Sequence, residues 1–190
     1  MAELTASAGQ VSAKVTIKRP RFDDLWQAYS EVGNKKADPV YQLIGGNVAE
    51  LREQNPADYT NACALRMSRA FNYGNFKIPK GTIIKNRNIY RVKGKDTLPY
   101  IMRVNDLIPF IIHNWGQADL SLDPINISQL MGKKGLIVIN VSGWGDATGH
   151  VTLWNGSITG DGTNYQDVNS DAYRDTPNVK PTKILYWELK

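Results

Sequence analysis

Cysteine is the scarcest residue in the chain, because Cys63 stands alone among 190 residues. A single cysteine excludes an intrachain disulfide framework. Only two histidines accompany it, and so small a supply of soft ligands argues against a structural zinc site. We therefore expect no metal site, and no pattern in the sequence points to a cofactor.

The chain also lacks long apolar runs and dense basic runs. No stretch approaches the roughly 20 apolar residues that a membrane-spanning helix needs, so we expect no membrane insertion. The 23 lysines and arginines exceed the 18 acidic residues and give a net charge of +5, which favours an anionic partner. Because the basic residues are scattered and not interleaved with aromatic ones, the sequence argues against nucleic acid as that partner.

The first ten residues lack the basic and apolar segments of a secretion signal. This pattern fits a cytosolic protein, or one exported by a route that reads no such signal. A chain of 190 residues with 42% hydrophobic and 22% charged residues predicts one globular domain, 1–190. Within it, residues 1–18 are expected to be a flexible arm or to add an edge strand at 15–17.

Helical patterns come mainly early in the chain and strand patterns late. The predicted helices are 20–33, 39–44, 48–54, about 60–73 and 105–115. The predicted strands are 82–84, 88–92, 100–104, 136–141, 150–154 and 184–189. This order predicts the α+β class, with N-terminal helices packed on a mainly antiparallel sheet. The apolar, β-branched run 136–141 is typical of a central strand covered on both faces.

Two of these helices have more specific predictions. The first carries an aromatic and aliphatic stripe that we interpret as core: Phe22, Leu25, Trp26, Tyr29 and Val32. The last is expected to begin at an Asn105 cap and to bury Leu107, Ile108, Ile111, Ile112 and Trp115. His113 lies off that buried face, so we interpret it as a solvated or locally hydrogen-bonded histidine without a catalytic role.

Cys63 falls where a helix is predicted to begin. Thr60 and Asn61 are good N-cap residues, which places Cys63 in the first helical turn. There the helix dipole and the unpaired backbone N–H groups favour the thiolate. The alternative interpretation is that Cys63 is a small buried hydrophobic residue.

His150 opens a predicted strand that follows a glycine-rich turn, 142–149. Asn155-Gly156 then predicts a two-residue type I′ hairpin turn. A regular hairpin around that turn places Asp161 opposite His150, with Cβ atoms about 4.5–5.5 Å apart. A carboxylate there would fix the imidazole tautomer and leave the second nitrogen to act as a base. The alternative is a surface pair worth at most about 1 kcal/mol.

A thiol at a helix N-terminus and a histidine backed by an acid form the set that acyl transfer to sulfur requires. The helix N-terminus adds backbone donors for a tetrahedral oxyanion. Cys63 and His150 are far apart in the sequence, so only the fold can bring them together.

Two long motifs carry a resemblance to a known family. They are Asn61-Ala62-Cys63 with Arg66-Met67-Ser68, and the run 142–156, SGWGDATGHVTLWNG. Both are similar to the type VI secretion amidase effector family 4, whose members are papain-like cysteine peptidases related to the NlpC group. Shorter matches at 22–26, 44–47 and 185–189 extend the resemblance from about residue 20 to the end of the chain.

The resemblance implies a papain-like, NlpC-type fold and a role for each member of the motif. By position, Cys63 is the nucleophile, His150 the base and Asp161 the third catalytic residue. Candidate substrate-binding residues are Asn61, Ser142, Gly143 and Trp144. The alternative for the last three is ordinary turn structure with one packed indole.

The chain departs from the family pattern in three places. Ala64 stands where members often have proline, a change that affects only the opening turn of the helix. The extra cysteines that some members carry near the third catalytic residue are missing, so the loop after Asp161 has no redox clamp. The segment before Pro20 has no counterpart.

The implied activity is hydrolysis of the γ-D-glutamyl–meso-diaminopimelate amide in peptidoglycan stem peptides. The protein would be made in the cytoplasm and injected by the type VI secretion apparatus, without a signal peptide, into the periplasm of a rival bacterium. A cognate immunity protein, oligomeric and pressing a loop into the cleft, would protect the producer.

Two other kinds of function stay open. The first keeps the fold and changes the bond: an N-acetylmuramoyl–alanine amidase, a cross-bridge endopeptidase or a transglutaminase-like transferase. The second is a non-catalytic module that binds carbohydrate or cell wall.

Overall fold

The computed structural model describes residues 19–190 apart from 82, 85–86 and 146. The expected arm or edge strand at 1–18 and the first residue of the predicted strand 82–84 lie outside the described residues. The helices are α1 Phe22–Ser30, α2 Ala37–Ile44, α3 Asn47–Gln54, α4 Cys63–Tyr73, α5 Val104–Trp115, the 3₁₀ helix η1 Pro124–Leu130 and α6 Asp171–Arg174. The strands are β1 Ile83–Ile84, β2 Arg87–Asn88, β3 Val92–Lys93, β4 Pro99–Tyr100, β5 Leu120–Leu122, β6 Gly135–Ser142, β7 Gly149–Trp154 and β8 Lys180–Glu188.

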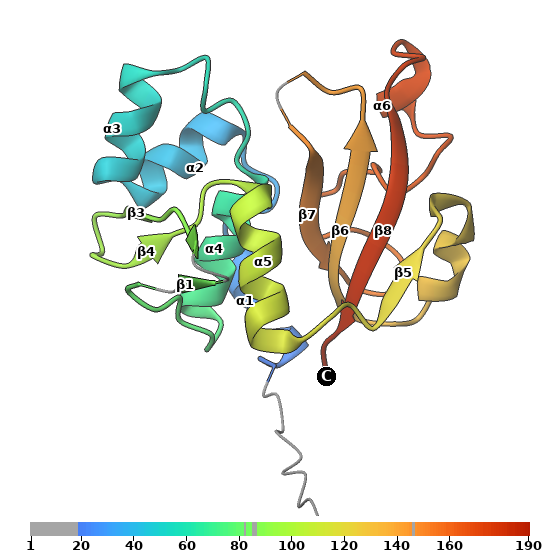
Figure 1. Ribbon diagram of the computed structural model, residues 1–190, viewed down its shortest axis with the longest axis horizontal. Helices are drawn as coiled ribbons and strands as arrows, with labels where there is room; N and C mark the ends of the chain where they lie inside the picture. The colour runs from blue at the N-terminus through green and yellow to red at the C-terminus, as the bar shows by residue number, and fades with distance from the viewer. Residues whose placement is uncertain (1–18, 82, 85–86, 146) are drawn as a thin grey trace, which may run out of the picture.

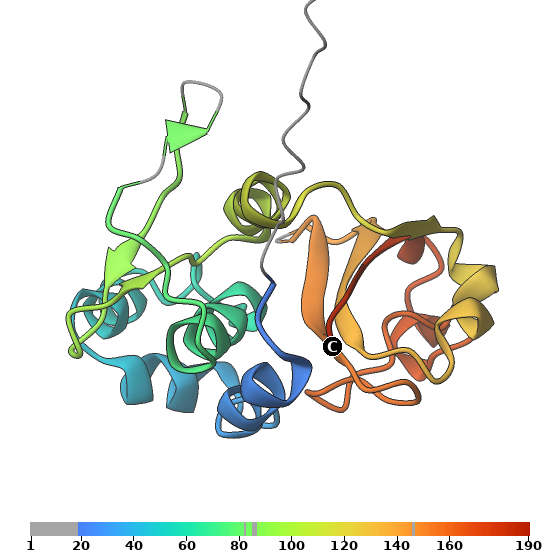
Figure 2. The same ribbon diagram turned by 90° about the horizontal axis from the view of Figure 1, so that it is seen from below.

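The molecule has a helical half and a sheet half. Helices α1 to α5 and two short antiparallel pairs, β1–β2 and β3–β4, make up the first half (Figure 1). The second is a four-stranded sheet in the order β5-β8-β6-β7, in which every neighbouring pair is antiparallel. Seen from below, the helices lie against one face of this sheet (Figure 2). This arrangement confirms the predicted α+β class.

Strand β6 lies inside the sheet and is covered on both faces, as its sequence predicts. Leu136 and Val138 pack into a core that they share with α1, α4 and α5. Ile137 and Ile139 point to the opposite face, where Trp154 and Tyr186 also pack. Alternate side chains of one strand thus enter two separate cores, because side chains alternate between the faces of a sheet.

A third core holds the helical half together. Its residues come from α2, α3, the loop before α4 and the β3–β4 pair: Val40, Tyr41, Ile44, Val48, Ala62, Leu65, Val92, Tyr100 and Met102 among them. Gly45 and Gly46, with φ of 63° and 59°, end α2 and begin α3 in backbone conformations that suit glycine. No helix in the described ranges is both long enough and apolar enough to cross a membrane.

The predicted cap and buried face of α5 need correction. The helix begins at Val104 after Arg103, so the expected strand 100–104 is limited to Pro99–Tyr100. Asn105 is therefore inside the helix, and its Oδ1 instead accepts a 2.8 Å hydrogen bond from Thr148 Oγ1. The fully buried residues of α5 are Leu107, Phe110, Ile111 and Trp115, whereas Ile108 and Ile112 are only partly buried.

The turn after β6 depends on one glycine. Gly143 has a φ of 89°, and a Cβ there would lie 2.2 Å from the carbonyl oxygen of Asn178. Both features are strained for any other residue. Gly145, two positions later, would place its Cβ in open space.

We expect Gly143→Ala to lower the free energy of unfolding by about 2 kcal/mol or more, because the φ value and the clash both oppose the new methyl group. Gly145→Ala, the matched control, should change it by less than about 0.5 kcal/mol. Urea denaturation of the two variants measures the difference. Equal stabilities would contradict the strained turn.

Candidate active site

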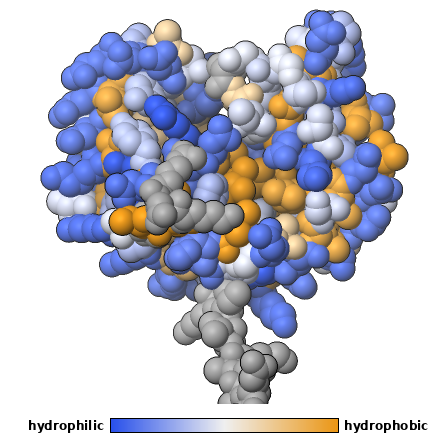
Figure 3. Space-filling view, in the orientation of Figure 1, coloured by the Kyte–Doolittle hydropathy of each residue, from blue (hydrophilic) through white to orange (hydrophobic). Residues whose placement is uncertain are grey.

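Two hollows meet at Cys63, in the cleft between the helical half and the sheet half. Their volumes are about 360 and 560 Å³, and both are lined by Asn61, Cys63, Trp144, Ala147 and Gly149. In the space-filling view, the outline of the molecule is indented at the top between its two halves (Figure 3). Both volumes are within the usual range of small-molecule sites.

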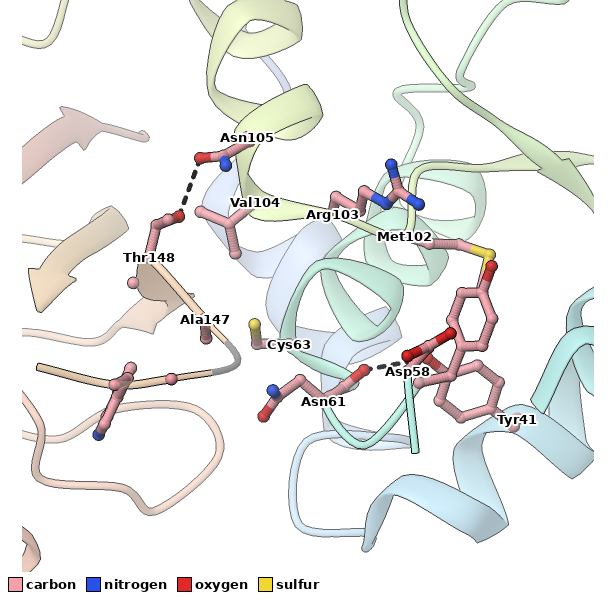
Figure 4. A pocket seen from close by; sticks show the side chains of 14 residues that line it. Tyr41, Asp58, Asn61, Cys63, Met102, Arg103, Val104, Asn105, Ala147 and Thr148 are labelled. Atoms are coloured by element: carbon pink, nitrogen blue, oxygen red, sulfur yellow. Dashed lines mark hydrogen bonds between the residues drawn. The ribbon is translucent and has the colours of Figure 1, made fainter. Parts of the chain in front are cut away.

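The first hollow lies on the helical side of Cys63. The Cys63 sulfur points into the space between Asn61, Val104 and Ala147 (Figure 4). The hydrogen bond from Thr148 to Asn105 joins the turn before β7 to the first turn of α5, so it ties the two halves together at the edge of this hollow.

Cys63 is the first residue of α4, and its cap differs from the prediction. The N-cap is Ala62, with φ −125° and ψ 9° and no side-chain capping bond, so Thr60 and Asn61 are not the cap. A tertiary contact holds the preceding segment outside the helix, because Tyr41 Oη donates a 3.0 Å hydrogen bond to the Asn61 carbonyl. The prediction that Cys63 lies in the first helical turn is confirmed.

His150 reaches Cys63 from strand β7, which packs against α4. The imidazole is hydrogen-bonded to the Cys63 side chain and is only 7% exposed. Its Nε2 lies 2.6 Å from Asp161 Oδ2, which leaves Nδ1 as the nitrogen that faces the sulfur. The fold therefore joins a thiol, an imidazole and a carboxylate in one continuous chain of contacts.

Asp161 contacts His150, but not through the predicted hairpin register. Asn155 and Gly156 belong to a wider loop in which Trp154 pairs with Thr159, and that register would place Thr163 opposite His150. The two-residue turn is therefore wrong. Its physical reason is the Asn155 side chain, whose Oδ1 accepts hydrogen bonds from Ser157 N–H at 3.0 Å and Ile158 N–H at 2.9 Å.

A second, tight turn brings Asp161 to the histidine. After Thr159 the chain turns back on itself: Gly162 N–H donates to the Thr159 carbonyl at 3.3 Å, and Gly162 has a φ of 71°. Asp161 projects from this turn, not from a strand. Thr163, which follows, places its Oγ1 3.4 Å from His150 Nε2, so both residues lie at the same ring nitrogen.

The Asp161 carboxylate is held on both oxygens. Oδ1 accepts hydrogen bonds from Thr163 Oγ1 at 2.8 Å and Thr163 N–H at 3.2 Å. Oδ2, besides facing His150, accepts a longer 3.4 Å bond from Tyr29 Oη of α1. Tyr29 Oη in turn accepts a 3.1 Å bond from Thr152 Oγ1 on β7. The carboxylate is therefore fixed from its own turn, from β7 and from the first helix.

These contacts set the charge state of the site. Burial raises the pKa of Cys63, but hydrogen bonding to His150, the charge of His150 and the N–H groups of Val151 and Ala64 together hold it below its usual value. Burial lowers the pKa of His150, yet Asp161 and Cys63 raise it to about 9. For Asp161, burial raises the pKa, and His150 and Thr163 bring it down to about 2. The geometry thus favours thiolate, imidazolium and carboxylate together at neutral pH.

Aromatic rings cover the histidine. Tyr165 packs edge-on against His150 with ring centroids 4.9 Å apart, and Trp144 packs edge-on against Tyr165 at 5.2 Å. Both rings line the second hollow. They place apolar surface beside the imidazole and limit the access of water to its contact with Asp161.

The other predicted site residues divide into two groups. Asn61 and Trp144 line both hollows. Ser142 and Gly143 line neither of them: Ser142 Oγ donates a 3.4 Å hydrogen bond to the Lys180 carbonyl, and Gly143 packs against Asn178. His113 is exposed on α5 and lines neither hollow.

Several neighbours of the site have little signal in the sequence. The pattern around Tyr29 predicts only a core residue, and its ring is indeed buried while its hydroxyl reaches Asp161. Thr163, Tyr165 and Arg66 also contact or line the site. A correct hairpin register would have indicated Thr163, whereas the other three depend on how the elements pack. Within the part of the chain that the structure describes, no three metal-ligating side chains cluster.

Asp161→Asn should lower the pKa of His150 from about 9 toward the ordinary 6.5, because the carboxylate stabilises the protonated ring. Titration of the imidazole signals by NMR measures this shift. The chain has one other histidine, His113, whose signal in the same spectra should be unaffected by the substitution. An unchanged His150 titration would show that Asp161 does not set its charge.

The fold and the site together define a class. A free thiol at a helix N-terminus, bonded to an imidazole that a buried carboxylate supports, is the equipment of a cysteine hydrolase on an α+β scaffold. The sequence profile of the family described as type VI secretion system (T6SS), amidase effector protein 4, matches residues 59–187. The chain belongs to this family, and it is therefore an enzyme, an amidase of the peptidoglycan-degrading effectors.

Solved structures agree with this assignment. Tae4 of Enterobacter cloacae, in an effector–immunity complex with Tai4, is 35% identical with a TM-score of 0.78, and covers 91% of this chain and 100% of its own. Tae4 of Salmonella typhimurium, in complex with the Enterobacter cloacae immunity protein Tai4, is 37% identical with a TM-score of 0.76 over 90% of this chain and 100% of its own. Tae4 of Enterobacter cloacae alone gives 34% and 0.74 over 93% and 100%. A comparison with curated proteins found no match.

Proposed function

We propose that the chain hydrolyses the amide between the γ-carboxyl of D-glutamate and meso-diaminopimelate in peptidoglycan stem peptides, with Cys63, His150 and Asp161 as its catalytic residues. The observation that carries this proposal is the buried contact chain from the Cys63 sulfur through His150 to Asp161, 2.6 Å at its second step, at the meeting point of two hollows. The family of amidase effectors to which the chain belongs supports it.

The reaction begins with the thiolate. The Cys63 sulfur attacks the γ-carbonyl carbon of D-glutamate and forms a C–S bond, and the carbonyl π electrons move to oxygen. When the tetrahedral intermediate collapses, the C–N bond breaks and the His150 imidazolium gives its proton to the leaving amine of diaminopimelate. The neutral imidazole then takes a proton from water, which attacks the thioester. Collapse releases the D-glutamyl carboxylic acid and restores the thiolate–imidazolium pair.

The first turn of α4 supplies the electrostatic support for this chemistry. Its backbone N–H groups have no partners within the helix, and they lie beside the sulfur. Donors aimed at a developing oxyanion contribute about 2.7–4 kcal/mol in comparable sites. Asp161 acts on the imidazole instead, because it keeps Nε2 occupied and the ring oriented so that Nδ1 serves the sulfur.

The place of action follows from the family. As a type VI effector the protein is delivered to target bacteria. We propose that it is made in the cytoplasm, exported without a signal peptide, and acts in the target periplasm, where peptidoglycan is exposed. Its relatives of known structure were solved with the immunity protein Tai4. We infer that a cognate immunity protein likewise binds this chain and occludes the cleft.

Cys63→Ala should abolish release of stem-peptide fragments from purified sacculi, because no other cysteine can form the thioester. Mass spectrometry of the released muropeptides after incubation with wild type and variant measures this loss. Wild type should leave fragments that end in D-glutamate, with diaminopimelate as the new N-terminus.

Two further results would decide between the alternatives. Fragments cut at N-acetylmuramic acid or within the cross-bridge would replace the proposed bond by another one, and a transfer product would replace hydrolysis. A Cys63→Ala variant that keeps its full effect on sacculi would indicate a binding module. His113→Ala is the control for a histidine outside the site and should retain near wild-type activity, whereas His150→Ala should lose it.

A further inference from the structure

Among the described residues, one arginine beside the site has no anionic partner. Arg66 lies one turn after Cys63 on α4, and it lines the same hollow as His150 and Tyr165. Residues three apart on a helix are neighbours on its surface, with Cβ atoms about 5–6 Å apart. The arginine therefore stands beside the nucleophile within the hollow.

The backbone fixes the position of this guanidinium but leaves most of its donors unused. Arg66 Nη2 donates a 2.6 Å hydrogen bond to the Lys35 carbonyl. Its Nε is shut off from solvent and has no acceptor in the described structure. A guanidinium has five N–H donors in a rigid fork, and an anchored fork is preorganised for a carboxylate.

Other arginines of the chain show what is missing here. Four form ion pairs with carboxylates: Arg19 with Asp119, Arg52 with Asp38, Arg69 with Glu31 and Arg174 with Asp171. Across the described ranges no carboxylate pairs with Arg66. Among the residues that line its hollow, the charged side chains other than histidine are Lys36 and Arg66, both cationic.

A partly buried cation without a counter-ion loses hydration and gains little in return. An anionic ligand would supply the missing partner, and a planar carboxylate matches the guanidinium fork. We propose that Arg66, assisted by Lys36, binds a carboxylate of the stem peptide next to the scissile amide. This inference rests on the proposed function and adds a determinant of its substrate specificity.

Two carboxylates of the stem peptide have the right chemistry. The α-carboxylate of D-glutamate is three carbons from the γ-carbonyl, on the acyl side of the bond. The side-chain carboxylate of diaminopimelate lies on the amine side. Because Arg66 is one helical turn from the attacking sulfur, the shorter reach of the D-glutamate α-carboxylate makes it the expected ligand, and amidation of each carboxylate in turn distinguishes them.

The experiment compares three synthetic L-Ala–γ-D-Glu–diaminopimelate tripeptides: unmodified, amidated at the D-glutamate α-carboxylate, and amidated at the diaminopimelate side chain. For wild type we expect kcat/KM to fall about 10- to 100-fold with the first amidation, which removes a charge-assisted bond. Arg66→Gln should lose a similar factor on the unmodified peptide, yet cleave the α-amidated peptide as wild type does. Arg69→Gln, on the same helix but paired with Glu31, is the matched control and should act as wild type on all three.

Binding gives a second readout that does not depend on turnover. In a Cys63→Ala background, titration calorimetry should show that Arg66→Gln weakens binding of the unmodified peptide about 10- to 100-fold and leaves that of the α-amidated peptide unchanged. A loss that follows the diaminopimelate amidation would assign Arg66 to the other carboxylate. Equal losses on all three peptides, or none, would overturn the proposal.

The same assay separates this inference from the proposed function. Fragment masses report which bond wild type cuts, whereas the ratio between peptides reports carboxylate recognition at whichever bond that is. In the calorimetric arm the ratio is read without any cleavage. A different bond with an intact ratio would therefore contradict only the proposed function.

Discussion

The site depends on the buried ion pair between His150 and Asp161. An imidazolium in so enclosed a position would be costly without a carboxylate in contact, and the carboxylate without its hydrogen bonds would be equally so. The structure satisfies both groups: Thr163 and Tyr29 bond to the carboxylate, and the carboxylate holds the ring against Cys63. Removing either charge would leave the other one buried and unpaired.

This constraint explains why the helical half and the sheet half must pack in register. The sulfur comes from the start of α4, the imidazole from β7 and one carboxylate donor from α1. The apolar core that α1 and α4 share with β6 and β7 fixes their relative positions, and it contains Cys63 itself. Packing of the core and assembly of the site are thus the same event.

Local patterns in the sequence predict the features that depend on them. The strand 136–141, the helix that begins at Phe22 and the position of Cys63 in a first turn follow from periodicity and from residues that end or begin helices. Asp161 is a more instructive case, because the right partner follows from the wrong hairpin. Asn155 is typical of a two-residue turn, but its side chain bonds to the two residues after Gly156 and so widens the loop.

Features that the sequence does not predict depend on contacts between distant elements. Tyr29 carries an apolar ring at a core position, and only the packing of α1 on β7 brings its hydroxyl to Asp161 and Thr152. Capping preferences at Thr60 and Asn105 fail for a related reason. Tertiary hydrogen bonds from Tyr41 and Thr148 engage the segments at the helix starts and outweigh the local preference.

The lone sulfur has a consequence for how the protein withstands a change of surroundings. No disulfide crosslink holds the fold, so its stability does not depend on whether the medium is reducing or oxidising. An internal disulfide cannot capture the nucleophile, because there is no second thiol to resolve a sulfenic acid at Cys63. Protection of that sulfur depends instead on its enclosure, with 8% of the residue exposed, and on whatever reductant reaches it from outside.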